Sequence, residues 1–308
     1  MPLPSCDPNG NVPCRTNFNF LPAWTQLAIY AVTAVALLIA AYGVWVRWKT
    51  WKEGPTGSTG ASFWLHLRRL IVIAGFQKKV ARRWYGGVMH ILLYTGFVAL
   101  GIGTTLVAVN TDITSHVNLD ILRGNPYLIF KAALDFMGLA FLLGLGMVFY
   151  RRLVARPKFL RNERPDLFLP GILFLLILQG YLLEAVRLAV LQPKWEEWSF
   201  LGYSLSLGLR ALGVNGSLAT VSATATAVTI TPAPALMWGY GALWWFHAGT
   251  WSYMLATLPW TKASHMIFSP ARTMAVHFYI LAREGLSMSH AYGTAAVLVI
   301  LILVINTV

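Results

Sequence analysis

The sequence predicts an all-α integral membrane protein that crosses the bilayer several times. Of its 308 residues, 57% are hydrophobic and only 11% are charged, and the mean hydropathy is +0.60. Soluble domains carry charge on roughly a quarter of their residues, so this composition excludes an ordinary soluble domain. Two further observations support the prediction: apolar runs of membrane-spanning length, and an uneven distribution of basic residues between the connections.

Runs of about 20 apolar residues can cross a hydrocarbon core about 30 Å thick as helices. Five such runs stand out, at 25–46, 86–109, 127–149, 168–190 and 236–258. A sixth run, 291–307, reaches the end of the chain. We therefore expect a bundle of five transmembrane helices plus a sixth, C-terminal transmembrane helix.

Basic residues concentrate in alternate connections, and this pattern predicts the orientation of the chain. Eighteen lie in or after the first, third and fifth connections, mainly in 47–84 and 151–164, against four on the opposite side. Because basic loops stay in the cytoplasm, we expect the N-terminus outside and these loops inside. The net charge of +13 is thereby explained by topology, and nucleic acid is excluded as a partner.

The segments outside the spans give three weaker expectations. The N-terminal segment lacks the layout of a cleaved signal peptide, so the first span is expected to remain as an anchor. Cys6 and Cys14 lie on the outer side, where a disulfide is permitted, and two free thiols are an equal alternative. Residues 63–76 suggest a helix at the membrane surface, and the 191–235 connection is expected to be a loop covering the outer face.

Histidines inside apolar segments indicate a cofactor. His247 lies within the fifth run, His265 follows eighteen residues later, and His90 enters the second run from the inner side. Histidine is costly in a bilayer and marks a functional site by default. Since His90 and His265 fall at similar depth, we predict that they hold the iron of a b-type haem between two helices.

A second haem would need a partner for His247. Met137 of the third run is at about mid-depth and would offer a thioether, although a methionine that fills the helix core is the simpler interpretation. Alternatively, the protein holds one haem and His247 lines a quinone pocket. Gly96, Gly101 and Gly103 would leave room for a flat macrocycle, or would serve close helix packing.

Four charged residues lie inside the third and fourth runs. Lys131 and Asp135 are one turn apart, and Glu184 and Arg187 are three residues apart, so each pair faces one direction. Charges at this depth normally pair or line a cavity. We predict either a quinone site, in which the acids exchange protons and the cations hold an oxygen, or structural ion links between helices.

The chain resembles the membrane cytochrome b module related to the nitrate reductase gamma subunit. The resemblance rests on GGVMHILLYTGFVALGIGTTLVAVNTD, RRLVARPKFL, LQGYLLEAVRL and LWWFHAGTWSYMLATLPWTKASHMIFSP, and it covers residues 25–275. It is strongest to the version that works with heterodisulfide-reductase-like iron–sulfur proteins, as in electron-transfer-flavoprotein:menaquinone oxidoreductases and sulfite-reduction complexes. Residues 1–24 and 276–308 then form an outer N-terminal segment and a C-terminal extension.

This resemblance implies a subunit of a prokaryotic cytoplasmic membrane that relays electrons between a cytoplasmic iron–sulfur or flavin partner and menaquinone or ubiquinone. His90, His247 and His265 match the axial histidines of the family. The second run departs from the family pattern because Leu100 stands about where a second histidine is expected. The alternatives are a membrane anchor subunit without a cofactor and, with less support from the sequence, a proton-coupled transporter.

Overall fold

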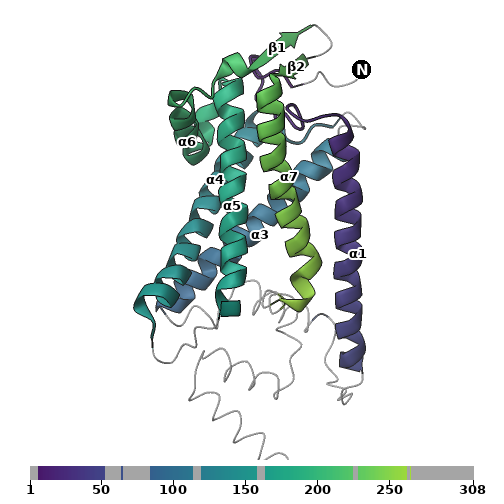
Figure 1. Cartoon of the computed structure of the whole chain (residues 1–308), viewed down its shortest axis with the longest axis vertical. Helices are drawn as coiled ribbons and strands as arrows, with labels where there is room; N and C mark the ends of the chain where they lie inside the picture. Colours follow the sequence, from purple (N-terminus) through teal and green to yellow (C-terminus); the bar gives the residue numbers. More distant parts are fainter. Residues whose placement is uncertain are drawn as a thin grey trace, which may run out of the picture. The chain divides into compact units, whose positions relative to one another are not determined.

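The computed structural model describes residues 6–52, 64, 84–113, 119–157, 164–224, 228–261 and 264 of the chain. The long helices are α1 (Trp24–Lys52), α3 (Trp84–Asp112), α4 (Asn125–Phe149), α5 (Arg164–Leu191) and α7 (Pro234–Thr257) (Figure 1). The first four contain the ranges predicted for spans, and α7 ends one residue before its predicted limit.

Four of these helices, α1, α3, α4 and α5, are long and apolar enough to cross a membrane, and the chain is a multi-pass membrane protein. The helix α7 has sufficient length, but its many tryptophans, tyrosines and glycines lower its mean hydropathy. The predicted sixth span, 291–307, lies outside the described residues, as does nearly all of the 63–76 segment.

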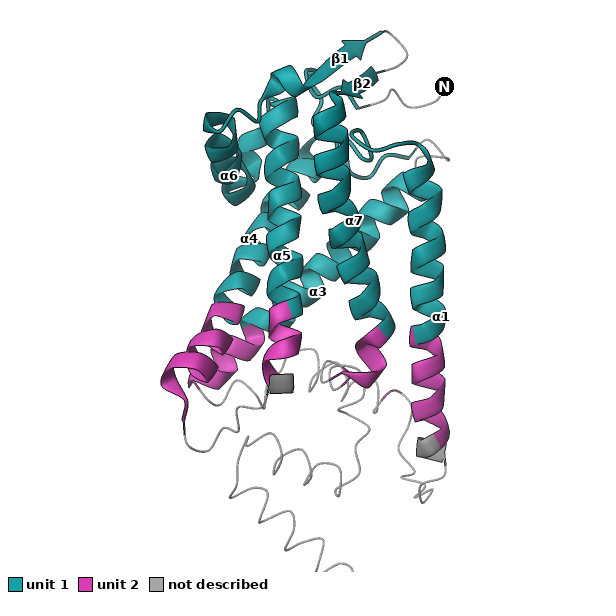
Figure 2. Cartoon of the chain, in the orientation of Figure 1, with its two compact units in different colours: residues 1–39, 92–144, 172–256 teal, residues 40–91, 145–171, 257–308 magenta. Residues whose placement is uncertain are grey.

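The chain divides into two compact units (Figure 2). Unit 1 contains residues 1–39, 92–144 and 172–256, and unit 2 contains 40–91, 145–171 and 257–308. The long helices contribute to both units, since each unit boundary falls within or at the end of a helix.

In unit 1 the helices approach each other at small residues. A Cβ atom added to Gly96 of α3 would lie 2.7 Å from Cβ of Phe141 on α4. One added to Gly138 of α4 would lie 2.4 Å from the hydroxyl of Tyr181 on α5. Such contacts let backbones approach closely, which is how membrane helices gain packing energy without a hydrophobic driving force.

The glycines of α3 were expected either to make room for a macrocycle or to allow close helix packing. In the structure, two of them pack closely and one has open space beside it. Gly96 and Gly103 pack closely against α4, because a Cβ on Gly103 would lie 2.6 Å from the side chain of Leu134. Gly101 has open space beside it, with no described atom within 4 Å of an added Cβ.

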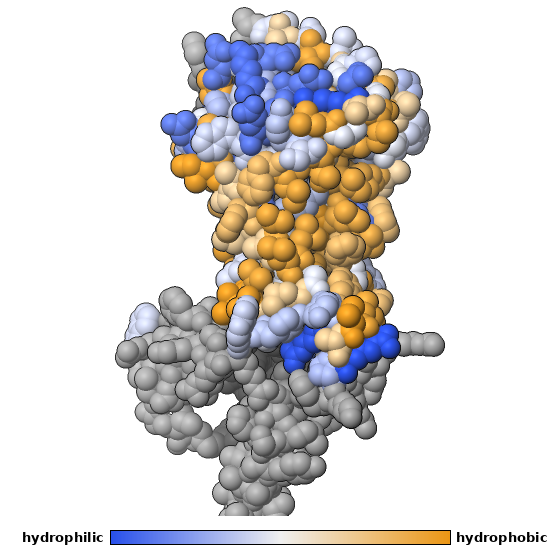
Figure 3. All heavy atoms as spheres, turned by 90° about the vertical axis from the view of Figure 1, so that its left-hand side faces the viewer, coloured by the Kyte–Doolittle hydropathy of each residue, from blue (hydrophilic) through white to orange (hydrophobic). Residues whose placement is uncertain are grey.

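The outward face of α4 is apolar. Ile129, Phe136 and Leu143 recur every seven residues, and all are well exposed. Figure 3 shows hydrophobic residues along the helices of unit 1 on this side and hydrophilic residues gathered toward one end. An exposed apolar stripe on a long helix is expected where lipid, and not water, surrounds the protein.

The connection between α5 and α7 is not the loop that its composition predicts. It forms the helix α6 (Phe200–Ala211), flanked by the 3-10 helices η5 (Glu196–Trp198) and η6 (Gly216–Leu218). Strands β1 (Ala219–Ala223) and β2 (Val228–Pro232) then pair as an antiparallel hairpin.

Alternation of side chains explains the hairpin. Val221 and Ile230 are paired in register, and both pack against a buried cluster that includes Phe20 and Leu236. Thr220, which precedes Val221 in β1, is exposed on the other face. The run of β-branched residues therefore folds as a strand pair with one apolar face.

The N-terminal segment packs on the same unit. Cys6 and Cys14 form a disulfide, with Cα atoms 5.6 Å apart. Cys14 is buried in a cluster with Leu122, Tyr127 and Trp195. The backbone amide of Gly124 donates a hydrogen bond to the carbonyl of Pro13 at 2.7 Å.

Unit 2 has its own contacts. A Cβ on Gly43 of α1 would lie 2.7 Å from the Trp260 ring, which belongs to the 3-10 helix η7 (Leu258–Trp260). The Tyr85 hydroxyl donates to the Met147 carbonyl at 2.8 Å. Past α4 the chain forms the π-helix η4 (Tyr150–Ala155), which stops at Arg156 in a left-handed conformation.

Candidate functional site

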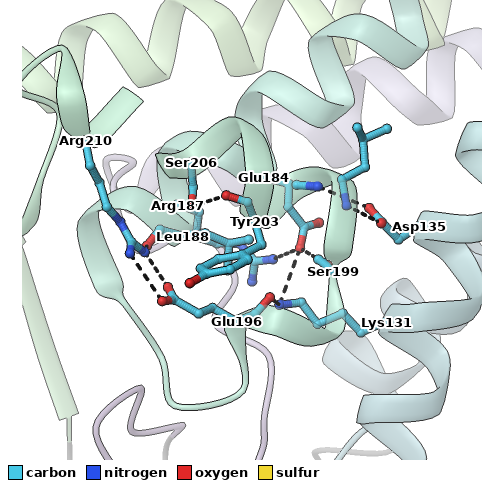
Figure 4. Close-up of polar contacts among 12 residues, drawn as sticks. Lys131, Asp135, Glu184, Arg187, Leu188, Glu196, Ser199, Tyr203, Ser206 and Arg210 are labelled. Atoms are coloured by element: carbon cyan, nitrogen blue, oxygen red, sulfur yellow. Dashed lines mark hydrogen bonds and ion pairs between the residues drawn. The ribbon is translucent and has the colours of Figure 1, made fainter. Parts of the chain in front are cut away.

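Three of the charged residues predicted inside the bilayer meet in unit 1 (Figure 4). The carboxylate of Glu184 on α5 lies 3.1 Å from the Arg187 guanidinium and 3.8 Å from the ammonium group of Lys131 on α4. Lys131 is only 5% exposed. The ion pairs therefore join α4 to α5 as well as adjacent turns of α5.

The fourth residue, Asp135, contacts the backbone of another helix. Its carboxylate accepts hydrogen bonds from the backbone amides of Leu201 at 2.7 Å and Gly202 at 3.4 Å. These amides belong to the first turn of α6, where free N–H groups and the helix dipole favour a negative charge. Asp135 is thus a cap for α6 supplied by another helix.

The segment that leads into α6 also reaches the ion pairs. The Ser199 hydroxyl donates to Glu184 at 2.8 Å, and the ammonium group of Lys131 donates to the carbonyl of Glu196 at 3.3 Å. The carboxylate of Glu196 pairs with Arg210 of α6, which in turn donates to the Leu188 carbonyl at 2.9 Å. Charged groups of α4, α5, η5 and α6 gather in one network, which we call the charge cluster: Lys131, Asp135, Glu184, Arg187, Glu196 and Arg210.

Arg15 of the N-terminal segment adds a further cation beside this cluster. It lies close enough to Arg187 and Glu184 to interact with their charges, and its guanidinium donates a hydrogen bond to the neutral side chain of Asn17 at 2.8 Å. Burial, and then the positive charge of Arg187, lower the pKa of Arg15 from its usual value. Arg187 also hydrogen-bonds Tyr127.

A small pocket lies against the charge cluster. Lys131, Arg187 and Tyr127 supply its main polar groups, and its apolar wall includes Cys14, Leu188 and Trp195. All of these residues belong to unit 1. The free space at its centre is about that needed for one water molecule.

Sequence reasoning found the four residues within the spans but missed the others. Glu196, Ser199 and Arg210 lie in the connection expected to be a loop. Arg15 was one of the four basic residues assigned to the outer side, and no contact was predicted for it. The contacts between Glu196 and Arg210 span fourteen residues, so no helical or strand period would reveal them. The prediction did not foresee that Asp135 would bind α6 backbone instead of a side chain.

His247 lies on α7 against α5. It has a backbone hydrogen bond with Leu176, and its Nδ1 is buried without a hydrogen-bond partner among the described residues. A Cβ on Gly180, one turn beyond Leu176, would lie 3.5 Å from Cε1 of the ring. The imidazole therefore lies close to the α5 backbone at Gly180, with space left for ordinary van der Waals contact.

The other predicted ligands are placed less completely. His90 is half-buried on α3 in unit 2, whereas His247 belongs to unit 1. His265 lies outside the described residues, so its pairing with His90 stays a prediction. Met137 is half-buried on α4, and its carbonyl oxygen lies 3.1 Å from where a Cβ on Gly96 of α3 would be.

Comparison with known proteins gives one informative similarity. The chain is 26% identical over 197 residues to the EtfAB:quinone oxidoreductase of Syntrophomonas wolfei subsp. wolfei (strain DSM 2245B / Goettingen). The aligned part is 63% of this chain and 25% of that protein, so the chain spans about a quarter of its relative. No family model matches the chain, and no solved structure matches it.

Proposed function

We propose that this chain is the membrane subunit of a quinone-linked redox complex. The observation that carries the proposal is the similarity to a quinone oxidoreductase, in a chain with four membrane-spanning helices. In the finer form of the proposal, the chain is a b-type cytochrome that relays electrons between a cytoplasmic iron–sulfur or flavin partner and the quinone pool.

The surroundings of His247 fit an axial ligand. A metal-bound imidazole uses one nitrogen for the metal and normally places the other in a hydrogen bond with a carbonyl or carboxylate. His247 has a buried Nδ1 without a hydrogen-bond partner and a backbone hydrogen bond with Leu176. An unpaired nitrogen at a buried position is costly unless a ligand completes it.

We propose that His90 and His265 hold one haem, and that His247 holds a second, with Met137 as its candidate fourth ligand. When bound, haem would supply one-electron transfer. The chain's own contribution is to fix the imidazoles. The Leu176 backbone orients His247, whose ring lies beside Gly180 of α5.

The charge cluster is the proposed place of quinone and proton chemistry. Lys131 and Arg187 line the pocket and carry N–H groups that can donate to a quinone oxygen. Glu184 and Asp135 are the proposed proton-exchanging acids. Glu184 is the stronger candidate, because Asp135 is engaged with the first turn of α6.

Topology completes the proposal. We propose that α7 is a fifth span, that the N-terminus lies outside and that the basic connections face the cytoplasm of a prokaryotic cell. The residues 47–84 and 151–164 would then face a soluble partner, either a heterodisulfide-reductase-like iron–sulfur subunit or an electron-transfer flavoprotein.

A reduced-minus-oxidised absorption spectrum with haem quantitation tests the proposal. The purified wild type should show a b-type spectrum. His90→Ala and His265→Ala should both remove the same haem, and His247→Ala should lower the haem content separately. His290→Ala, in the C-terminal extension, is the matched control and should retain the full content.

The alternatives predict other spectra. A membrane anchor without a cofactor would be colourless although folded. If the spectrum is present but no histidine replacement lowers the haem content, the ligand assignment is wrong while the cytochrome assignment stands.

A further inference from the structure

The described charges around the pocket do not balance. Arg15, Lys131, Arg187 and Arg210 face three carboxylates, those of Asp135, Glu184 and Glu196. One positive charge is therefore left over. The neighbouring Arg123 and Asp120 pair at 3.9 Å and add no net charge, and the exposed Lys194 and Glu197 carry opposite charges. Asp7, which precedes the lining residue Pro8, accepts a hydrogen bond from the backbone amide of Asn9.

The distribution of these charges points the excess at the pocket. Glu196 is held by Arg210, and Asp135 is held by the first turn of α6. Among the described carboxylates, Glu184 is the one that pairs directly with Lys131 and Arg187 and also interacts with Arg15. Lys131 and Arg187 are cationic residues that line the pocket, and none of the described lining residues is acidic.

Uncompensated charge in a buried position is costly, and proteins resolve it with a counterion or a shift in protonation. The lowered pKa of Arg15, caused by burial and by Arg187, has the direction expected when too many cations share a site. A negative ligand in the pocket would relieve the same repulsion.

We propose that this pocket binds a monatomic anion, chloride, between Lys131, Arg187 and the hydroxyl of Tyr127. These three groups all offer N–H or O–H donors from α4 and α5. The free space, about that of one water molecule, suits a monatomic anion and is too small for a polyatomic one such as gluconate.

The anion site goes beyond the proposed redox function and does not depend on it. The same donors are proposed above to hold a quinone oxygen, so the anion occupies them when quinone is absent. A quinone ring would need more space than the pocket has, and the wall that would have to move includes the disulfide-linked Cys14.

Thermal unfolding of the purified full-length protein in detergent provides the test. Chloride replaces gluconate at constant ionic strength, and the midpoint temperature should rise with a saturable dependence on the chloride concentration. Arg15→Gln removes the excess charge without breaking an ion pair, and it should raise the half-saturating anion concentration on the order of tenfold. The matched control is Lys194→Gln, because Lys194 lies at the same end of the unit and contacts Asn11, outside the cluster.

Two outcomes would overturn the anion site. One is a midpoint temperature that does not depend on the small anion in a saturable way. The other is an equal anion response in Arg15→Gln and Lys194→Gln, which would locate the effect elsewhere. A crystal grown with bromide gives a check that needs no variant: an anomalous peak beside Lys131 and Arg187 supports the site, and a peak-free pocket contradicts it.

Discussion

Asp135 shows how a single side chain can link elements that are distant in sequence. Its carboxylate binds two backbone amides of α6, while its own carbonyl accepts a hydrogen bond from Tyr181 of α5 at 2.7 Å. Residue 135 thereby fixes α6 and α5 relative to α4 within unit 1. The same α6 segment carries Ser199 to Glu184, so the cap and the ion pairs support each other.

Replacement of Asp135 tests this role at the residue scale. Asp135→Ala should lower the free energy of unfolding by about 1 kcal/mol, because it removes a cap and a charge at the N-terminus of α6. Asp135→Asn keeps one acceptor oxygen and should lose less. Thermal unfolding in detergent measures both, and equal losses for the two variants would contradict the capping role.

At the scale of elements, α4 is the helix on which the charge cluster depends. It packs against α3 through Gly96 and Gly103, and against α5 through Gly138. Ile129, Phe136 and Leu143 make the exposed face of α4 apolar. Lys131 and Asp135 therefore point into the protein because the remaining faces of α4 are taken by lipid-facing and glycine-contact positions.

Gly138→Ala tests the packing of α4 on α5. The added Cβ would lie 2.4 Å from the Tyr181 hydroxyl, and overpacking of this kind costs roughly 1–3 kcal/mol in the free energy of unfolding.

The matched control is Gly146→Ala on the same helix, where an added Cβ meets no described atom within 4 Å. That variant should be neutral or slightly stabilised, since alanine favours a helix over glycine. Thermal unfolding of both variants is the measurement, and a neutral Gly138→Ala would show that Tyr181 moves aside freely.

At the scale of the whole molecule, the number of membrane spans among the described helices depends on α7. The length of α7 suffices to cross the bilayer, while its aromatic residues and glycines lower its hydropathy. We predict that α7 crosses the membrane. Reporter tags inserted at 225–227 and after Thr261 should then be accessible from opposite sides in intact cells.

A tag after Arg156, in a basic connection, serves as the cytoplasmic reference. The tag after Thr261 should behave like this reference, and the tag at 225–227 should not. Accessibility of both test sites from the same side would restrict the spans of the described residues to α1, α3, α4 and α5.

The sequence by itself determined the membrane class, the positions of the long helices and the four charged residues within them. Apolar runs are local and must satisfy their backbone hydrogen bonds internally in lipid, so helices follow from composition alone. The predicted 127–149 and 168–190 thus fall inside Asn125–Phe149 and Arg164–Leu191.

Only the tertiary structure decided which charges meet. The spacing of Lys131 and Asp135 indicated only that the two side chains face one direction, and the structure shows that Lys131 pairs with Glu184 while Asp135 caps α6. The helix α6, the hairpin and the approach of Arg15 depend on contacts between segments far apart in the chain. Helix periodicity reports the face on which a side chain lies, whereas its partner is set by the packing of helices, which no local pattern encodes.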